Sequence, residues 1–242
     1  MSTSPPSLPH ESTQQLPNPV LILIDTDSLL QVLIAEETRL LRFVKRTYRI
    51  QPAITEAVEV ETRGKLRVRA RFQKDLDKIL SEESLVVLDT RTLPAYVTTD
   101  AHAVYNSMQA VGFDYARNGL DYGEAYTYAA AIVLKAPVIS NDLNAVKTAR
   151  KKALQLPISI ARTFDLVALC HQGGYLQERD CDAIRQVLFR EREFLPAAFQ
   201  HSSFAKGLDH FYLRFVDCST AITGASDPIT ELDVRIVLSR SP

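Results

Sequence analysis

The stretch VLILIDTDSLL, residues 20–30, starts as a run of five apolar residues and then turns acidic. A short run that is apolar throughout is typical of a strand buried on both faces of a parallel sheet. Asp25 follows the run directly, and Asp27 comes two positions later. Asp25 could simply cap the next helix. It could also belong to a site, provided that other acids reach the same place in the fold.

Helices and strands are predicted to alternate along most of the chain. Apolar residues at helical spacing occur from residue 55 onward and in the segments 28–48, 99–111, 119–136, 144–154, 164–174 and 180–193. Strand-like runs occur at 19–24, 48–54, 85–88, 137–140 and 158–161. This alternation predicts an α/β fold, a three-layer αβα domain with a central, mainly parallel sheet, over residues 19–198.

The two ends of the chain differ from this middle part. Residues 1–18 are rich in Ser, Pro and Gln, which predicts a disordered N-terminal arm. Residues 199–242 form a C-terminal extension in which HFYLRF and DVRIVL look strand-like. The extension could be an extra hairpin, an interaction arm or a partly disordered tail.

Composition limits the classes of protein that the chain can belong to. Of 242 residues, 46% are hydrophobic and 24% charged, as in ordinary globular proteins. Because the net charge is -1, the chain as a whole does not attract nucleic acid, and any nucleic-acid site must be a local basic patch. The three cysteines are far apart and fit neither a metal motif nor a disulfide framework, which favours a reducing compartment. Without a membrane-spanning apolar run or signal-peptide features, we expect no membrane partner and a cytoplasmic location.

Acidic residues are predicted to converge at one edge of the sheet. Asp25 and Asp142 both come just after strand-like runs, and ligands of open parallel sheets bind at the carboxyl ends of the strands. In the helix that opens at residue 55, Glu61 falls on the inward-facing side, whereas Glu56 and Glu59 point elsewhere. That choice depends on the rotation of the helix.

A fourth acid comes from the helix predicted at 119–136. Glu124 lies on its inward face, and Asp121 stands three positions earlier, at the spacing of a capping box. We interpret Asp121 as the helix cap, and Asp89, after the run at 85–88, as a turn residue. Gathered carboxylates repel one another, and a hard cation such as Mg²⁺ or Mn²⁺ relieves that repulsion through oxygen ligands. Histidine is absent from these motifs, which argues against zinc.

Together, these motifs resemble those of PIN-domain nucleases, including the toxins of bacterial toxin–antitoxin pairs. The family's first strand, which ends in Asp, is similar to LILIDTDSLL, and its segment with a helical Glu is similar to PAITEAVEVE. Its helix, strand and second Asp are similar to GLDYGEAYTYAAAIVLKAPVISNDLNAVKTARKKA. Asp27 departs from the pattern, because Asn or Ser is commoner there. The resemblance implies a metal-dependent endonuclease, acting on RNA, with Asp25, Glu61, Glu124 and Asp142 as catalytic acids.

Within that implied set, Asp25, Glu124 and Asp142 are the expected ligands of Mg²⁺ or Mn²⁺. The implied partners are RNA, an antitoxin protein and, in a homodimer, a second copy of the chain. Two alternatives stay open. A PIN-like fold could serve as an inactive interaction scaffold, and IDTDSLL is also similar to the Asp-x-Asp loop of haloacid-dehalogenase-type phosphatases.

Basic residues next to the predicted acids could bind the phosphates of RNA. RGKLRVRARFQK, residues 63–74, contains six cations and no acid, and we select Arg67, Arg69 and Arg71 from it as substrate-binding residues. Lys147 and Arg150 follow Asp142 and form a second candidate. A basic run can equally be a solvated face without a ligand.

Overall fold

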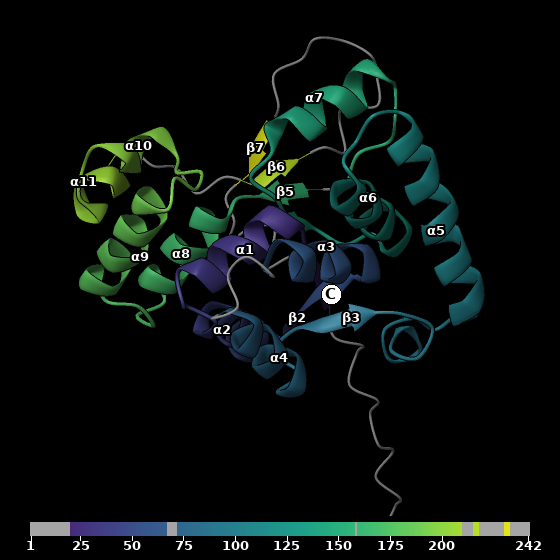
Figure 1. The fold of residues 1–242 in the computed structure, drawn as a ribbon, viewed down its shortest axis with the longest axis horizontal. Helices are drawn as coiled ribbons and strands as arrows, with labels where there is room; N and C mark the ends of the chain where they lie inside the picture. The colour runs from purple at the N-terminus through teal and green to yellow at the C-terminus, as the bar shows by residue number, and fades with distance from the viewer. Residues whose placement is uncertain (1–19, 67–71, 158, 210–214, 218–229, 233–242) are drawn as a thin grey trace, which may run out of the picture.

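A parallel sheet forms the centre of the molecule (Figure 1). The computed structural model describes residues 20–66, 72–157, 159–209, 215–217 and 230–232. Its strands run in the order β3-β2-β1-β4-β5-β6-β7, and β1 to β5 are all parallel. Their bounds are β1 Val20–Ile24, β2 Ile50–Thr55, β3 Val86–Leu88, β4 Val138–Ile139, β5 Ser159–Ala161, β6 Phe215–Asp217 and β7 Thr230–Leu232. The predicted α/β fold with a mainly parallel sheet is confirmed.

Helices connect the strands and cover both faces of the sheet (Figure 1). Their bounds are α1 Thr26–Ile34, α2 Arg39–Tyr48, α3 Glu56–Leu66, α4 Gln73–Ser81, a 3-10 turn Leu93–Ala95, α5 Ala101–Arg117, α6 Tyr122–Leu134, α7 Leu143–Lys151, α8 Thr163–Gln172, α9 Glu178–Arg190, α10 Ala197–Gln200 and α11 Phe204–Leu208. This is the arrangement of a three-layer αβα fold.

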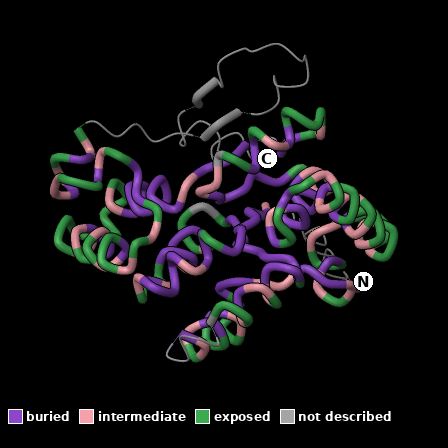
Figure 2. Tube along the Cα trace, turned by 45° about the horizontal axis from the view of Figure 1, so that its top comes forward, coloured by how far each residue is buried: buried purple, intermediate pink, exposed green. Residues whose placement is uncertain are grey.

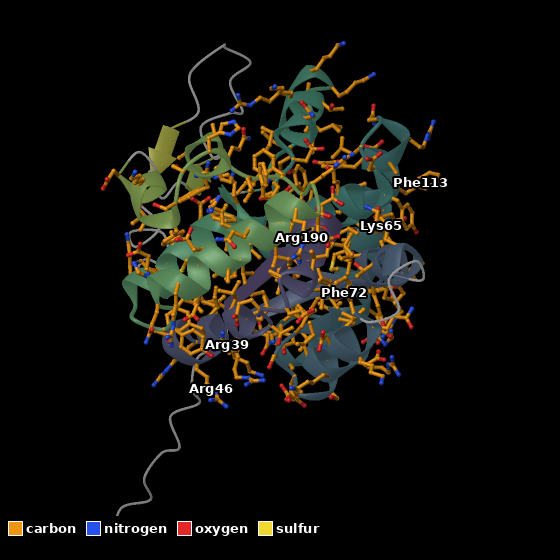
Figure 3. The ribbon with its side chains drawn as sticks, turned by 60° about the vertical axis from the view of Figure 1, so that its left-hand side comes forward. Arg39, Arg46, Lys65, Phe72, Phe113 and Arg190 are labelled. Carbon is orange, nitrogen blue, oxygen red and sulfur yellow. The ribbon has the colours of Figure 1, made fainter. Side chains whose placement is uncertain are left out.

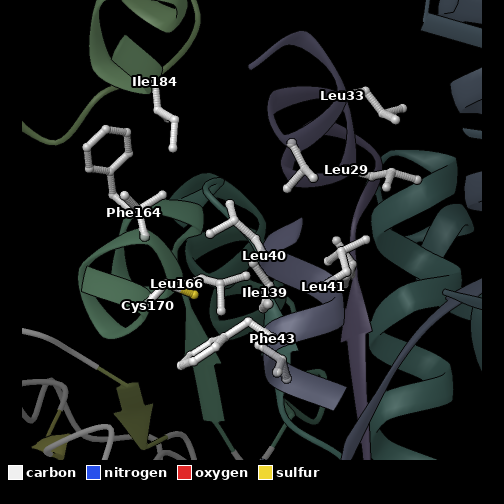
Figure 4. Packing of buried hydrophobic residues seen from close by; sticks show 14 of the residues in the cluster. Leu29, Leu33, Leu40, Leu41, Phe43, Ile139, Phe164, Leu166, Cys170 and Ile184 are labelled. Atoms are coloured by element: carbon white, nitrogen blue, oxygen red, sulfur yellow. The ribbon is translucent and has the colours of Figure 1, made fainter. Parts of the chain in front are cut away.

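Alternate residues of the central strands enter two separate cores. Ile22 and Ile24 of β1 pack into one core, with side chains from α1, α2, α4, α8 and α9, part of which Figure 4 shows. Leu21 and Leu23 of the same strand pack into the other, with α5, α6 and α7. The strand can therefore be apolar at every position, because both of its faces are buried. Figure 2 shows the same pattern, with buried strands inside and exposed residues on the outer helix surfaces.

Two features of the fold differ from the sequence-based expectation or refine it. The helical spacing over 28–48 covers two helices, α1 and α2, because the chain turns between them at Glu36, whose φ is 54°. Past residue 198, Phe199 and Phe204 are fully buried in the same core as α1. The strands β6 and β7 pair antiparallel and extend the sheet beyond β5. Apart from Phe215, the two segments that look strand-like in the sequence, 210–215 and 233–238, lie outside the described residues. The predicted arm, residues 1–18, lies outside the described residues.

Among the helices that the structure describes, none combines the length and the apolar character needed to cross a membrane.

Candidate acidic site at the edge of the sheet

The pairing of β1 with β4 brings the first acid to the expected edge. Ile24 pairs with Ile139, so the residues that follow, Asp25 and Ser140, lie side by side. The backbone N–H of Asp25 donates to the carbonyl of Ile139 at 3.1 Å, which continues the ladder by one residue. Asp142 stands only two positions beyond Ser140. The carboxyl ends of these two strands therefore deliver both aspartates to one place.

Asp25 is both a helix cap and a buried acid. Its Oδ1 accepts a hydrogen bond of 2.8 Å from the backbone N–H of Ser28 and thereby caps α1. Only 2% of the residue is exposed, and burial raises its pKa to about 6, although hydrogen bonds from Ser140 and Ser28 act in the opposite direction. Capping a helix and belonging to an acidic site are thus compatible for this residue.

Glu124 and Asp142 form a pair across the gap between α6 and α7. The two side chains share a hydrogen bond, and Glu124 is half-buried. The pKa of Glu124 rises to about 8, first through burial, then through the charge and hydrogen bond of Asp142, and further through Asp25 and Asp121. The protonated form of Glu124 is therefore favoured near neutral pH. Asp142 also caps α7, since its Oδ1 accepts from the backbone N–H of Asn144 at 2.6 Å.

Asp121 occupies the N-cap position of α6 but does not cap through its side chain. Within the described part of the chain, its carboxylate makes no capping hydrogen bond. The predicted capping box between Asp121 and Glu124 is therefore wrong. The physical reason is that Glu124 is engaged by Asp142, so it does not turn back to the start of its own helix.

Glu61 joins three elements beside this pair. Its Oε2 accepts from the Thr26 hydroxyl at 3.0 Å and from the backbone N–H of Gly123 at 3.1 Å, and its Oε1 lies 3.0 Å from the ammonium of Lys65. A Cβ at position 123 would lie 2.3 Å from Oε2 of Glu61 and 2.4 Å from Oγ1 of Thr26. Only glycine therefore lets the start of α6 approach Glu61 this closely.

The neighbouring acids of α3 have other partners. Glu56 accepts from the Tyr105 hydroxyl, and Glu59 pairs with Arg63 at 2.9 Å. Asp27 is exposed and pairs with Lys65 at 2.9 Å. Of the acids in α3, Glu61 is the one that faces the start of α6, which is the orientation that helical spacing predicts.

Asp89 has the turn role that its position after β3 predicts. Its Oδ1 accepts from the backbone N–H groups of Arg91 and Thr92, both at 2.8 Å, and its Oδ2 binds the Arg91 guanidinium. Burial would raise the pKa of this carboxyl, but those hydrogen bonds outweigh burial and lower it.

A buried polar network under the acids was not predicted. The side-chain amide of Asn141 donates to Ser28, Gln31 and Thr163 at 3.2, 3.0 and 2.9 Å, and its oxygen accepts from the backbone N–H of Thr163 at 3.1 Å. Ser28, Gln31 and Thr163 are each at most 2% exposed. The network fixes the segment between β4 and Asp142. The one local signal for it is the polar residue Asn141 directly after a buried strand.

The candidate phosphate-binding residues come from two segments of the chain. Arg67, Arg69 and Arg71 lie outside the described residues. Lys147 and Arg150 are exposed on α7, the helix that Asp142 caps.

No group of three or more acidic, histidine or cysteine side chains is arranged to hold a metal ion in residues 20–66, 72–157 and 159–209. The arrangement instead offers a pair, Glu124 and Asp142, with Asp25 close enough to raise the pKa of Glu124. Comparisons with known proteins add no assignment: no protein-family model matches the chain, and no curated protein matches it.

Proposed function

We propose that the protein is a Mg²⁺- or Mn²⁺-dependent endonuclease that hydrolyses phosphodiester bonds in RNA. One observation carries the proposal: Glu124 and Asp142, from two different helices, meet beside Asp25 at the carboxyl edge of a parallel sheet. Open α/β sheets bind their ligands at that edge. Two members of this group, Asp25 and Glu124, have a raised pKa, and carboxyl groups with a raised pKa in such a position are candidates for a functional site.

The donor chemistry of the pair fits a hard divalent cation. Mg²⁺ and Mn²⁺ prefer carboxylate oxygens and keep several water ligands, so one or two carboxylates are sufficient when substrate phosphate completes the shell. The proton shared by Glu124 and Asp142 occupies a place where a cation would neutralise the same charge. When bound, such a cation supplies Lewis acidity at a phosphate oxygen and lowers the pKa of a water molecule.

The chain's own residues would hold this site in shape. The hydrogen bonds from Ser28 and Ser140 orient Asp25. Glu61 accepts from the backbone of Gly123, the residue before Glu124, and so fixes the start of α6. We therefore assign Glu61 a positioning role and Asp25, Glu124 and Asp142 the direct roles. At the exposed edge of this site, the charges of Asp27 and Lys65 neutralise each other.

RNA remains the preferred substrate because cations adjoin the acids in sequence, at Arg67, Arg69 and Arg71 and at Lys147 and Arg150. The toxin role, with an antitoxin partner or a homodimer, stays part of this proposal. Expression of the chain in bacteria tests it: growth arrest by the parent and normal growth with Asp25→Asn would support a toxin.

The direct test of the activity uses Asp25→Asn. Asparagine still caps a helix well, so we expect the folded structure and its circular dichroism to be retained. Cleavage of RNA in Mn²⁺ should be lost, whereas the matched variant Asp75→Asn, on α4, should cleave like the parent. Full activity of Asp25→Asn would contradict the assignment.

The inactive-scaffold alternative is favoured by the absence of a three-ligand group from the described residues. A ligand that binds only the native state raises the melting temperature. A melting temperature that does not respond to Mn²⁺, together with no RNA cleavage, would establish the scaffold instead.

A further inference from the structure

The end of α9 carries exposed aromatic and charged side chains, and Nε of Arg190 lies 3.9 Å from Oε1 of Glu191 there. Phe189 and Phe194 are 55% and 46% exposed, and Arg190 and Arg192 are exposed between them. We call these four residues the α9 rim. Figure 3 labels Arg190 at the end of this helix. Two large aromatic side chains are therefore exposed within six residues, which makes this end of α9 a candidate interaction site.

A shallow hollow of about 470 Å³ opens in this surface. Phe189 forms an aromatic wall, the buried Leu195 lies in the lining, and Arg190, Arg192 and Gln200 add polar groups. Glu193 is the one acid among the described lining residues, against two arginines. Two of the six described lining residues are apolar and four are polar or charged, so the hollow offers both an aromatic face and polar groups.

The rim is connected to the acidic site through one glutamine. Gln31 donates from Nε2 to the carbonyl of Phe194 at 3.0 Å, and its Oε1 accepts from the Asn141 side chain, also at 3.0 Å. Asn141 directly precedes Asp142. Two hydrogen bonds therefore tie the backbone of Phe194 to the segment that presents Asp142.

The chemistry of the rim matches single-stranded nucleic acid. Unpaired bases stack on aromatic side chains, and arginines bind the phosphates between them. A base-paired duplex keeps its base faces covered and could not use Phe189 or Phe194 in this way. The backbone turns at Arg192, whose φ of 60° is the left-handed conformation that commonly ends a helix.

We propose that the α9 rim binds the unpaired bases and phosphates of the RNA strand that the acidic site cleaves. A base stacks on Phe189 in the hollow, Arg190 and Arg192 bind the flanking phosphates, and Phe194 supports the strand on its way to Glu124 and Asp142. This inference rests on the proposed function for its substrate, but it predicts binding that does not need the metal.

The test measures RNA binding without metal, which separates it from cleavage. A fluorescently labelled, unstructured RNA strand is titrated with protein in EDTA, and the same strand with abasic sites serves as the comparison. Phe189→Leu keeps an apolar side chain and removes the stacking ring, and Phe189→Ala removes both. We expect both variants to bind the intact strand roughly tenfold more weakly than the parent, or weaker still, because stacking on one aromatic residue is worth about 1–3 kcal/mol. The abasic strand should bind parent and variants alike.

Two further variants complete the design. Arg192→Ala should reduce the slope of log K against log salt by about 0.7, the share of one phosphate contact on a single strand. Phe113→Ala is the matched control, since Phe113 is 60% exposed on α5, on the other side of the molecule from α9 (Figure 1). It should bind RNA like the parent.

Several results would overturn the assignment of the rim. These are equal affinities for the parent and Phe189→Leu, an equal loss on the abasic strand, or no binding of RNA by the parent in EDTA. A parent dimer that Phe189→Leu and Phe194→Ala convert to monomers would assign the rim to a second copy instead. Metal-free binding that needs Phe189, in a protein that never cleaves RNA, would retain the rim and refute only the nuclease.

Discussion

Removing the charge of Glu124 should make the metal-free protein more stable at neutral and alkaline pH. The pKa of this carboxyl is about 8 in the folded protein against an ordinary 4.5, so the folded state holds its proton more tightly than the unfolded chain does. A raised carboxyl pKa means that the associated stability is fully present below pH 4.5 and is lost as pH rises through 8. Glu124→Gln keeps the size of the side chain and removes this loss.

The magnitude follows from the same two values. One pKa unit corresponds to about 1.4 kcal/mol, so complete ionisation of Glu124 would cost roughly 5 kcal/mol if none of the shift were screened. The side chain is only half-buried, and solvent screens part of the interaction, so we expect about 2–3 kcal/mol. Parent and Glu124→Gln should have nearly equal free energies of unfolding at pH 4.5. The variant should be more stable by that amount at pH 8.5.

Urea unfolding in EDTA at a series of pH values measures this difference. Glu178→Gln, which changes an exposed carboxyl on α9, is the control for the removal of a carboxylate. Saturating Mn²⁺ should stabilise the parent and remove the advantage of Glu124→Gln. A pH-independent difference between the parent and Glu124→Gln would refute the proton-sharing pair of Glu124 and Asp142.

Three other changes have defined outcomes. Gly123→Ala should lower the free energy of unfolding by about 1–3 kcal/mol, because the new Cβ would lie 2.3 Å from Glu61 Oε2; an unchanged urea midpoint would show that Glu61 is free to move. Glu61→Gln should lower the free energy of unfolding of the metal-free protein by about 1 kcal/mol, because the ion pair with Lys65 is lost. Glu124→Gln should raise the same free energy at pH 8.5, so a stabilising effect of Glu61→Gln in urea unfolding would count against the assigned positioning role. Replacing Arg67, Arg69 and Arg71 with Ala should reduce the salt slope of RNA binding by about 2, and identical slopes in an anisotropy titration would show that the run is only a solvated face.

The positions of the strands and of the strand-end acids could be predicted because two-sided burial leaves a plain signal. A strand such as Val20–Ile24 must be apolar at every position, and the first acid after it then lies at the carboxyl edge. The break between α1 and α2 could not be predicted, since the apolar spacing continues across the turn at Glu36. The network around Asn141 could not be predicted because its partners, Ser28 and Gln31 on α1 and Thr163 on α8, are far from Asn141 in sequence and become its neighbours only through the order β1-β4-β5.

Asp25 and Asp142 show why capping and participation in a site need not be separate explanations for an acid after a strand. Each accepts a backbone N–H of the helix that follows it, at 2.8 Å for Asp25 and 2.6 Å for Asp142, and such a cap typically stabilises a protein by about 1 kcal/mol. Glu124 makes no comparable contribution, because its raised pKa destabilises the folded protein once it ionises. The two caps hold their carboxylates in fixed orientations, and of the two acids whose pKa is raised, Asp25 to about 6 and Glu124 to about 8, Glu124 has the larger rise and makes no cap, so its retention most needs a functional explanation.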